Sequence, residues 1–433
     1  MSTDTISSQY SNNLHYALSA DRDDVLNKIR ESYLIPHDHL GNEQIYFCGN
    51  SLGLQPKSCS TAIQKVMDTW ATKGVEGWFD GDDAWVNSLQ YSTKILSNII
   101  QGLPSELAIA NSLSVNLHLL LLSFYQPSAE RYKIIIEADA FPSDQYIAKS
   151  QIRYKGYDPK DSLVIIRPHK RGKAITYREI KDCLKIHGHE ACLILISGVN
   201  YSTGQAFDIP SITNLGHQYG CYVGLDLAHA IGNIPLNLHD DQVDFAAWCH
   251  YKYLNAGPGS IGGMFVHQKH HNSDLPKLHG WWGNKSESKF KMDPDFDGEI
   301  GAQSWVMSTP SQLSIAALGA SLALFDQVGM SALRDKSIKL TGYLEYLIND
   351  LLEHQVEILT PPDPKHRGCQ LSLKIDMNGR QIYRSLIEHQ VICDWREPNI
   401  IRLSPCPMYN TYVEVYQAVQ ILAAIFKTKK RPR

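Results

Sequence analysis

The sequence predicts an α/β protein with a mostly parallel central sheet, followed by a smaller α+β domain at the C-terminus. Short apolar runs rich in isoleucine and valine recur through the middle of the 433-residue chain. They do not alternate with polar residues, which is typical of parallel strands covered on both faces. Stretches with room for crossover helices separate them, and this succession of strand and helix is the α/β pattern.

The elements of the large sheet can be placed in chain order. The expected strands are residues 132–138, 162–168, 191–198, 221–228, 243–249 and 262–268. The intervals 177–187 and 212–219 have the length of crossover helices. We therefore expect a large α/β domain over residues 46–315.

The C-terminal third has a different pattern. Apolar residues recur at helical spacing over Ala332–His354, which predicts a long amphipathic helix. A proline-rich breaker, three extended segments (residues 369–375, 391–395 and 399–405) and a last helix near residues 412–426 follow. We expect a small α+β domain over residues 316–433, with the N-terminal segment 1–45 packed against it.

Composition and charge narrow the functional classes. The formal net charge is -4, so no strong field favours nucleic acid or an anionic membrane. No apolar run approaches the roughly 20 residues of a membrane helix, and the first residues lack a secretory signal pattern. The nine cysteines are scattered without a CxxC motif, which indicates a reducing, cytoplasmic location and no metal site.

Asp226 and Lys252 are the strongest candidates for functional residues. Asp226 ends one apolar strand, and Lys252 follows 26 residues later, just beyond the next strand. Ligands of open α/β sheets bind at the carboxyl ends of the strands. A carboxylate there can hold a pyridinium nitrogen and a lysine can form a Schiff base with an aldehyde, and pyridoxal phosphate needs both. Singly, each residue has an ordinary structural explanation; together they predict a site for this cofactor.

Two further segments fit a cofactor site without requiring one. Ser114 lies near the start of an expected helix, where backbone N–H groups and the helix dipole favour a phosphate, although for this segment alone a plain serine cap is the better explanation. Phe141, directly after a strand, could stack on a planar ring, or it is an ordinary packed phenylalanine.

Three weaker features remain open. Trp281 belongs to a glycine-flanked pair of loop tryptophans, which indicates a binding surface, an interface or a small satellite core. Arg402 lies inside an apolar run and needs a partner, either a protein carboxylate or a substrate carboxylate. The cluster of His267, His270 and His271 lacks acidic partners, and we interpret it as part of a loop.

Several long motifs resemble the kynureninase family. These are IYFCGNSLGLQPKS (residues 45–58), NSLSVNLHLLLLSFYQP (111–127), FPSD, SGVNYSTGQ (197–205), GCYVGLDLAHAIGN (220–233), VDFAAWCHYKYLNAGPGSIGG (243–263), GWWGN and IRLSPCPMYN (401–410). The resemblance covers residues 25 to 425. It implies the aspartate-aminotransferase-like fold type I and a homodimer whose active sites lie at the subunit interface. It also implies pyridoxal-phosphate-dependent hydrolysis of L-kynurenine to anthranilate and L-alanine, in tryptophan catabolism and NAD biosynthesis.

The resemblance assigns roles residue by residue. Lys252 would form the Schiff base, Asp226 would pair with the pyridine nitrogen, and Tyr251 would be a further catalytic candidate. The remaining cofactor-binding residues would be Leu113, Ser114, Phe141, Pro142, Ser143, Asp144, Ser197, His229, and, from the neighbouring subunit, Trp281 and Thr309. Those facing the substrate would be Asn50, Ser51, Trp78, Thr309 and Arg402, with Arg402 binding the α-carboxylate.

Two positions bear on the choice of substrate. Family members that prefer 3-hydroxykynurenine have histidine where we align Trp78 and asparagine where this chain has Thr309. We therefore expect L-kynurenine to be the better substrate. Asp241 stands where the family usually has tryptophan, which affects local packing and not the reaction class.

Other readings of the same residues remain. Another reaction on this cofactor fold, a desulfurase or a transaminase, is the nearest alternative. A desulfurase needs a mobile nucleophilic cysteine, and the late cysteines, Cys369, Cys393 and Cys406, lie in apolar or proline-bounded contexts. A non-catalytic module that senses an amino acid is the third, and intact Lys252 and Asp226 argue against it.

Overall fold

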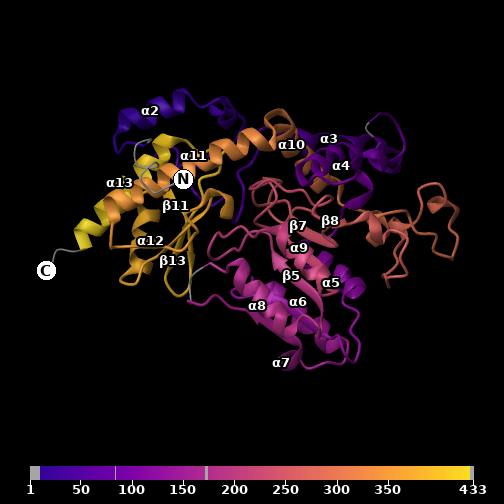
Figure 1. The fold of residues 1–433 in the computed structure, drawn as a ribbon. Helices are drawn as coiled ribbons and strands as arrows, with labels where there is room; N and C mark the ends of the chain where they lie inside the picture. The colour runs from indigo at the N-terminus through magenta and orange to yellow at the C-terminus, as the bar shows by residue number, and fades with distance from the viewer. Residues whose placement is uncertain (1–9, 83, 171–173, 430–433) are drawn as a thin grey trace.

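The computed structural model describes residues 10–82, 84–170 and 174–429. The first nine residues, in which the sequence has no secretory signal pattern, lie outside these ranges. Within them the chain forms a seven-stranded sheet, a four-stranded sheet and a two-stranded pair. Figure 1 shows the large sheet with α5, α6, α8 and α9 in one half, and the small sheet with α2, α12 and α13 in the other.

The large sheet has the order β2-β8-β7-β6-β5-β3-β4. Its strands are β2 (Leu107–Ile109), β3 (Lys133–Glu137), β4 (Leu163–Ile166), β5 (Ala191–Ser197), β6 (Tyr222–Asp226), β7 (Phe245–Cys249) and β8 (Gly262–Val266). β8 runs antiparallel to both β2 and β7, and the other neighbouring pairs are parallel. The mostly parallel sheet and all six expected strands are confirmed. The sequence missed β2, whose three residues are too short to form a recognisable apolar run.

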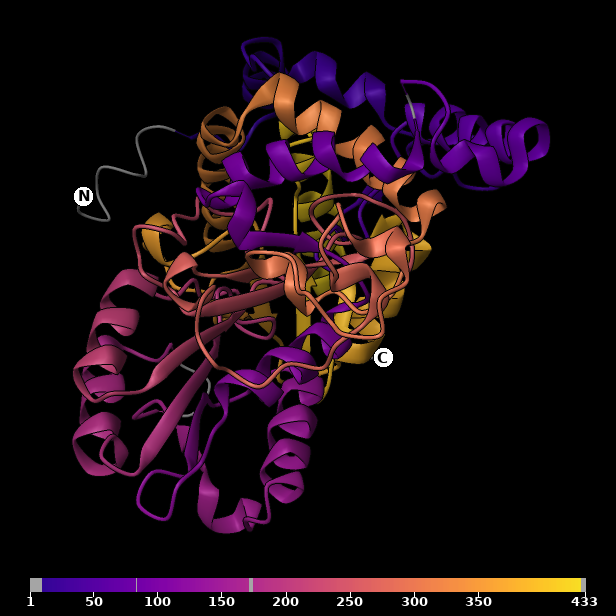
Figure 2. The same cartoon turned by 90° about the vertical axis from the view of Figure 1, so that its right-hand side faces the viewer.

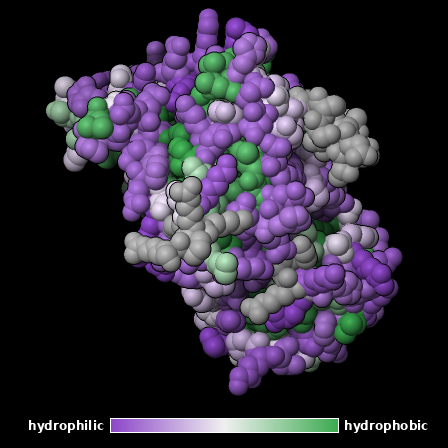
Figure 3. Space-filling model, turned by 90° about the vertical axis from the view of Figure 1, so that its left-hand side faces the viewer, coloured by the Kyte–Doolittle hydropathy of each residue, from purple (hydrophilic) through white to green (hydrophobic). Residues whose placement is uncertain are grey.

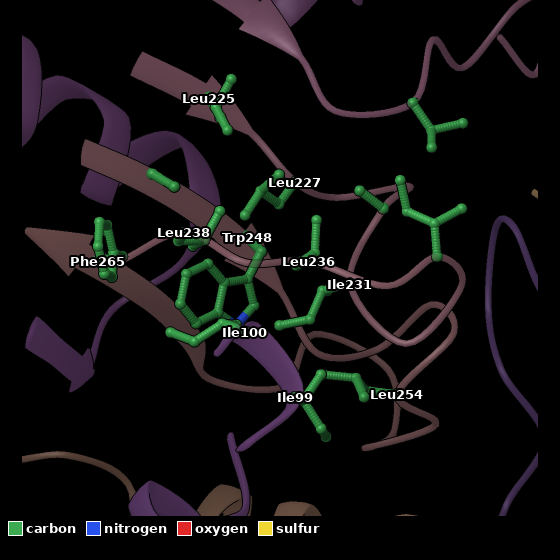
Figure 4. Close-up of a cluster of buried hydrophobic side chains, with 14 of the residues drawn as sticks. Ile99, Ile100, Leu225, Leu227, Ile231, Leu236, Leu238, Trp248, Leu254 and Phe265 are labelled. Carbon is green, nitrogen blue, oxygen red and sulfur yellow. The ribbon is translucent and has the colours of Figure 1, made fainter. Parts of the chain in front are cut away.

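Helices cover both faces of this sheet. The helices of this part of the chain are α3 (Ser58–Lys73), α4 (Leu89–Ile100), α5 (Leu113–Phe124), α6 (Pro142–Tyr154), α7 (Pro159–Ser162), α8 (Tyr177–His187), α9 (Ile209–Gln218) and α10 (Gln312–Val328); α3 packs against α10. Successive strand residues point to opposite faces, so Ile134 and Ile136 belong to the core beside α5 and α6, whereas Ile135 belongs to the core beside α8 and α9. Figure 4 shows part of this second core, where Trp248 packs among aliphatic side chains.

The small domain is built on a four-stranded antiparallel sheet. Its elements are α11 (Met330–Leu352), β9 (Glu357–Ile358), β10 (Leu371–Lys374), α12 (Gly379–Glu388), β11 (Val391–Ile392), β12 (Asp394–Arg396), β13 (Ile400–Leu403) and α13 (Tyr412–Lys429). The sheet order is β12-β13-β10-β9. The expected helices and extended segments are all present.

The N-terminal segment contacts the small domain. β1 (Ile45–Tyr46) pairs with β11, and α2 (Leu14–Arg22) packs against α13. Side chains of α10, by contrast, lie in the core of the large sheet, and α11 continues from it into the small domain (Figure 1). The expected division at residues 45 and 315 therefore stays a prediction, since elements on both sides of each boundary share contacts.

The surface of the molecule is more polar than its interior. The face drawn in Figure 3 is mostly hydrophilic, with apolar side chains in separate patches. Figure 2 shows the ribbon of Figure 1 turned by 90°, with the helices of the large domain on the outside of its sheet. Among the described residues no single helix is long and apolar enough to cross a membrane; α10 and α11 meet the length and composition only as a pair bent by 81°.

Candidate active site

A cavity of about 430 Å³ lies at the carboxyl edge of the large sheet, facing the small domain. β5, β6 and β7 end side by side there, because Ser197 pairs with Asp226 and Asp226 with Ala247 in the strand register. Thirteen of the predicted site residues line the cavity. They are Asn50, Ser51, Leu113, Ser114, Phe141, Ser143, Asp144, Ser197, Asp226, His229, Tyr251, Lys252 and Arg402.

Lys252 enters the cavity from the loop that follows β7. Its Nζ atom lies 3.0 Å from Nε2 of His229 and 5.8 Å from the centre of the Phe141 ring. His229 is buried, and burial together with the charges of Lys252, Arg402 and Arg396 lowers its pKa well below the ordinary value. The imidazole is therefore neutral and can accept a hydrogen bond from the lysine amino group or donate one to it, depending on its tautomer.

A group of buried acids lies beside Asp226. One Asp226 carboxylate oxygen accepts a hydrogen bond of 2.7 Å from the backbone N–H of Ala228. Burial, the charge of Asp226 and a hydrogen bond with it raise the pKa of Asp144 well above its ordinary range. Asp144 is thus protonated at neutral pH and can donate a hydrogen bond to the Asp226 carboxyl group.

Glu137, at the end of β3, is a third acid that the sequence did not reveal. Its carboxylate accepts hydrogen bonds from the side chain and the backbone N–H of Ser197. Burial raises the pKa of Glu137 to about 7 despite the lowering effect of these bonds. Ser197, predicted as a cofactor neighbour, is therefore fixed by its two hydrogen bonds to Glu137.

Two helix N-termini meet at another side of the cavity. Ser114 lies in the first turn of α5 and Ser143 in the first turn of α6, and their Oγ atoms are 2.9 Å apart. The residues at the two N-cap positions, Ser112 and Phe141, make no side-chain cap, so first-turn N–H groups remain for a ligand. Together they form an anion-binding cradle. Ser114 is not the cap that the sequence left open as an alternative.

Tyr251 borders this cavity next to Lys252. Burial and the nearby Cys249 raise the pKa of the Tyr251 phenol. Its hydroxyl therefore stays protonated at neutral pH and can donate a hydrogen bond.

The segment that carries Asn50 and Ser51 is held against the lysine loop by Gly53. The N–H of Gly53 donates to the carbonyl of Tyr251 at 2.8 Å. A Cβ atom at Gly53 would lie 2.1 Å from Oδ1 of Asn255 and 2.3 Å from the carbonyl of Lys252. Only glycine permits this close approach, which fixes both segments of the cavity wall relative to each other.

Arg402, on β13, lines the cavity on the side of the small domain. It is 1% exposed and pairs with Asp394 on the neighbouring strand β12, so the protein carboxylate expected as one alternative exists. Its NH1 donates to the carbonyl of Tyr201 at 2.7 Å. Arg402 also lines the cavity, so it can contact a substrate carboxylate while it is paired with Asp394.

Several cavity residues were missed from the sequence. Tyr201 and Arg396 line the cavity, and Asp394 is buried beside it. The motif around Tyr201 was visible, but nothing in it distinguishes that residue from its neighbours. Arg396 follows Asp394 by two positions on β12, so both side chains fall on one face, and that alternation was the available signal.

Four predicted residues do not line this cavity. Pro142 begins α6 between two lining residues. Trp78, Trp281 and Thr309 lie elsewhere: Trp281 is 43% exposed, and Thr309 is exposed. Trp282 links the two tryptophans, with its ring centre 5.6 Å from that of Trp78 and 5.8 Å from that of Trp281.

The interpretation of the histidine cluster without acidic partners was wrong. His270 lies 2.8 Å from Asp244, and His267 lies 3.9 Å from Glu106. Both acids are far away in sequence, so only the sheet brings them together. Both carboxylates also accept hydrogen bonds from backbone N–H groups, and neither lines the cavity. We therefore interpret these histidines and acids as a structural network.

Polar atoms around the cavity lack partners. Among the described residues, the buried atoms without a hydrogen bond include Asn50 Oδ1, His229 Nδ1 and Arg402 Nε. Unpaired buried polar groups are costly, and three around one cavity indicate a polar ligand.

Comparison with known proteins identifies the family of this chain. The family model described as the kynureninase C-terminal domain matches residues 333–422. A kynureninase from Myxococcus xanthus is 45% identical over 408 residues, covering 94% of this chain and 96% of its own. One from Xanthomonas oryzae pv. oryzae is 47% identical over 408 residues, covering 93% and 96%.

A solved structure shares the fold. It is a mutant of C-DES with glycine covalently linked to the PLP cofactor, with a TM-score of 0.74 at 19% identity, covering 88% of this chain and 96% of its own. This likeness confirms the expected fold class. Because curated relatives at 45% and 47% identity match over more than nine-tenths of its length, the chain belongs to the kynureninase family.

Proposed function

We propose that the cavity at the sheet edge is where this enzyme hydrolyses L-kynurenine to anthranilate and L-alanine, with 3-hydroxy-L-kynurenine as the poorer substrate. Family membership gives the reaction class. The observation that carries the proposal for the site is the position of Lys252 beside neutral His229, with the Asp226 carboxyl group on the adjacent strand end.

Pyridoxal phosphate is the cofactor, and the residues present fit it. A lysine amine, an aspartate carboxyl group, two helix N-termini and unpaired polar atoms surround one cavity. When bound, the cofactor supplies an electron sink that stabilises negative charge at the substrate carbon next to the amine. Lys252 would hold its aldehyde carbon and Asp226 its ring nitrogen.

The other predicted cofactor residues have matching chemistry. Leu113, Ser114 and Ser143 would offer first-turn N–H and hydroxyl groups to the phosphate, and Tyr251 would donate its phenolic proton. Phe141 presents its half-exposed ring to the cavity, where it would stack on the planar cofactor.

Proton transfer belongs to Lys252 and its neighbour. The lysine amine would remove the proton from the substrate α-carbon, because it lies at the point where the substrate amine must enter. His229 stays neutral and 3.0 Å away, so it can stabilise either protonation state of Nζ without adding charge. Protonated Asp144 would donate a hydrogen bond to Asp226 and hold it oriented towards the ring nitrogen.

The small-domain side would orient the substrate. Arg402 offers its unpaired Nε to the α-carboxylate, and the unpaired Oδ1 of Asn50 and the hydroxyl of Ser51 border the same space. A fixed carboxylate places the α-carbon between Lys252 and the cofactor.

We further infer a homodimer with shared active sites. Trp78, Trp281 and Thr309 do not line the cavity of their own chain, and the segment between β8 and α10 projects beside α3 and α4 (Figure 1). Trp281, Phe79 and Phe290 are an exposed aromatic group, with 43%, 54% and 48% exposure. Such a surface favours a protein contact, and a second copy would bring Trp281 and Thr309 to the site.

We also infer a cytoplasmic location. All nine cysteines are free thiols, which suits a reducing compartment.

A desulfurase is the less suitable alternative. Cys369, Cys393 and Cys406 are buried, and burial raises the pKa of each thiol, that of Cys406 to about 12. Such thiols stay protonated and fixed, and of the described residues that line the cavity, none is a cysteine.

The test is product formation from L-kynurenine by the protein loaded with pyridoxal phosphate. We expect anthranilate fluorescence and equimolar L-alanine, and neither from Lys252→Ala. A transaminase would need a keto acid and would not release anthranilate. Absence of anthranilate with the wild type, in the presence of bound cofactor, would contradict the proposal.

A further inference from the structure

Three charged side chains meet on the small-domain side of the cavity. Asp394 and Arg396 lie on β12, and Arg402 lies on β13 directly opposite Asp394 in the antiparallel register. The side chain of Arg402 is 1% exposed, that of Asp394 6% and that of Arg396 39%. Two guanidinium groups therefore share one carboxylate, and the group has a formal charge of +1.

Arg402 is already matched by protein groups. One terminal nitrogen contacts the carboxylate of Asp394 and lies 3.3 Å from Oγ of Ser51, which itself donates to Asp394 at 2.5 Å. The other terminal nitrogen donates to the carbonyl of Tyr201, so Nε is the donor left without a partner. A substrate carboxylate would meet a buried ion pair with no net charge, which attracts it weakly.

Arg396 supplies the unmatched charge. Its NH1 lies 3.0 Å from Asp394 Oδ1 and donates to the carbonyl of Trp395 at 3.1 Å, and the side chain lines the cavity. Both arginines act inside the cavity, since their charges contribute to the lowered pKa of His229. With Arg396 in place, an incoming carboxylate brings the net charge of the group from +1 to zero.

Resting on the proposed function, we propose that Arg396 is a second substrate-binding residue that receives the α-carboxylate together with Nε of Arg402. Asp394 is the positioning residue between them, because it contacts both guanidinium groups. This arrangement makes the site selective for amino acids over amines: without a carboxylate, a ligand leaves one positive charge and one donor unmatched.

The experiment compares L-kynurenine with its decarboxylated amine in the cofactor-loaded enzyme. For Arg396→Gln we expect the KM for L-kynurenine to rise by about 10- to 100-fold, as for loss of a charged hydrogen bond. The inhibition constant of the amine should change by less than about twofold, because it has no carboxylate to lose. Arg396→Lys should recover most of the affinity, since it restores the charge.

Arg380→Gln is the matched control. Arg380 lies in the same domain, is 63% exposed and pairs with Glu397 outside the cavity, so its removal should change neither constant. The affinity for pyridoxal phosphate, followed by absorbance, should be the same in all variants. This readout separates substrate binding from damage to the cofactor site.

Two results would overturn the proposal. One is a KM for L-kynurenine that stays within about twofold in Arg396→Gln; the other is an equal loss of affinity for the amine. If Arg402→Gln abolishes the preference for the carboxylate and Arg396→Gln does not, the inference alone is wrong. If the wild type releases no anthranilate, the proposed function itself fails.

Discussion

The amino nitrogen of Lys252 lies 3.0 Å from Nε2 of His229 in a cavity where the imidazole is fully enclosed. The two residues come from successive strand ends, 23 positions apart in sequence. Since burial and three nearby cations disfavour the imidazolium form, His229 is a neutral partner for the lysine. This pairing links the fold of the sheet edge to its protonation behaviour.

His229 should make the unliganded protein sensitive to mild acid. Its pKa in the folded state is well below the ordinary value of 6.5, so the unfolded chain binds a proton that the folded chain excludes. Stability is therefore lost as the pH falls below about 6.5, and His229→Gln should lose about 1–2 kcal/mol less than wild type between pH 8 and pH 5. Denaturant unfolding at both pH values measures this. Exposed His15→Gln should behave like wild type, and an equal pH response in all three proteins would contradict the prediction.

Asp244 should also contribute stability that is lost as the pH falls, but at a lower pH than for His229. Its side chain is 2% exposed and lies within 2.8 Å of His217, Lys269 and His270. Burial alone would raise its pKa, but these partners lower it below the ordinary value of 3.8.

Asp244→Asn should therefore destabilise the protein by about 3–5 kcal/mol at pH 7, because it removes a buried carboxylate that pairs with Lys269, contacts His217 and His270, and accepts from the backbone N–H of Val223. The loss should persist down to about pH 5 and shrink only below about pH 4, where the unfolded carboxylate takes up a proton. Thermal unfolding across this range checks it. A variant as stable as wild type at pH 7 would show that the network contributes little.

These two networks also show what the sequence could and could not predict. Asp226 and Lys252 were found because strand ends are visible as the limits of apolar runs, and a sheet edge gathers them. The pairs of His270 with Asp244 and of Arg402 with Asp394 depend on strand register, which short strands do not reveal. Glu137 looked like an ordinary strand residue, since its role follows only from the burial of Ser197 above it. The family motifs named most cavity residues, but they did not distinguish Arg396 or Tyr201 from their neighbours.

Shared active sites predict complementation between inactive subunits. Lys252→Ala chains should be inactive, and Trp281→Ala/Thr309→Ala chains strongly impaired. Heterodimers would combine an intact lysine with an intact Trp281 and Thr309, so an equal mixture should regain about a quarter of wild-type activity. Activity after mixing and sedimentation of each protein measure this. A chain that carries all three substitutions, mixed with Trp281→Ala/Thr309→Ala chains, should restore no activity. A fully active monomer would contradict the prediction.

Trp78 and Thr309 should set the choice between the two substrates. An apolar tryptophan gives no matched donor to a ring hydroxyl, and an unmatched group costs about 1–3 kcal/mol, or roughly one to two decades in kcat/KM. Wild type should prefer L-kynurenine, and Trp78→His/Thr309→Asn should shift the ratio of kcat/KM values towards 3-hydroxykynurenine.

Trp70→His is the control for that comparison, because Trp70 is 62% exposed on α3 and lies apart from the Trp78–Trp282 contact. It should leave the ratio unchanged. A wild type that prefers the hydroxylated substrate, or a ratio that the double substitution does not move, would remove the argument for these two residues.

The most direct measurement is the identity of the lysine that carries the cofactor. The protein loaded with pyridoxal phosphate is reduced with borohydride, digested and analysed by peptide mass. We predict one phosphopyridoxyl group per chain, on the peptide that contains Lys252, and none after Lys252→Ala. Modification of a different lysine, or a wild-type protein that shows no stoichiometric modification, would contradict the assignment of this cavity as the active site.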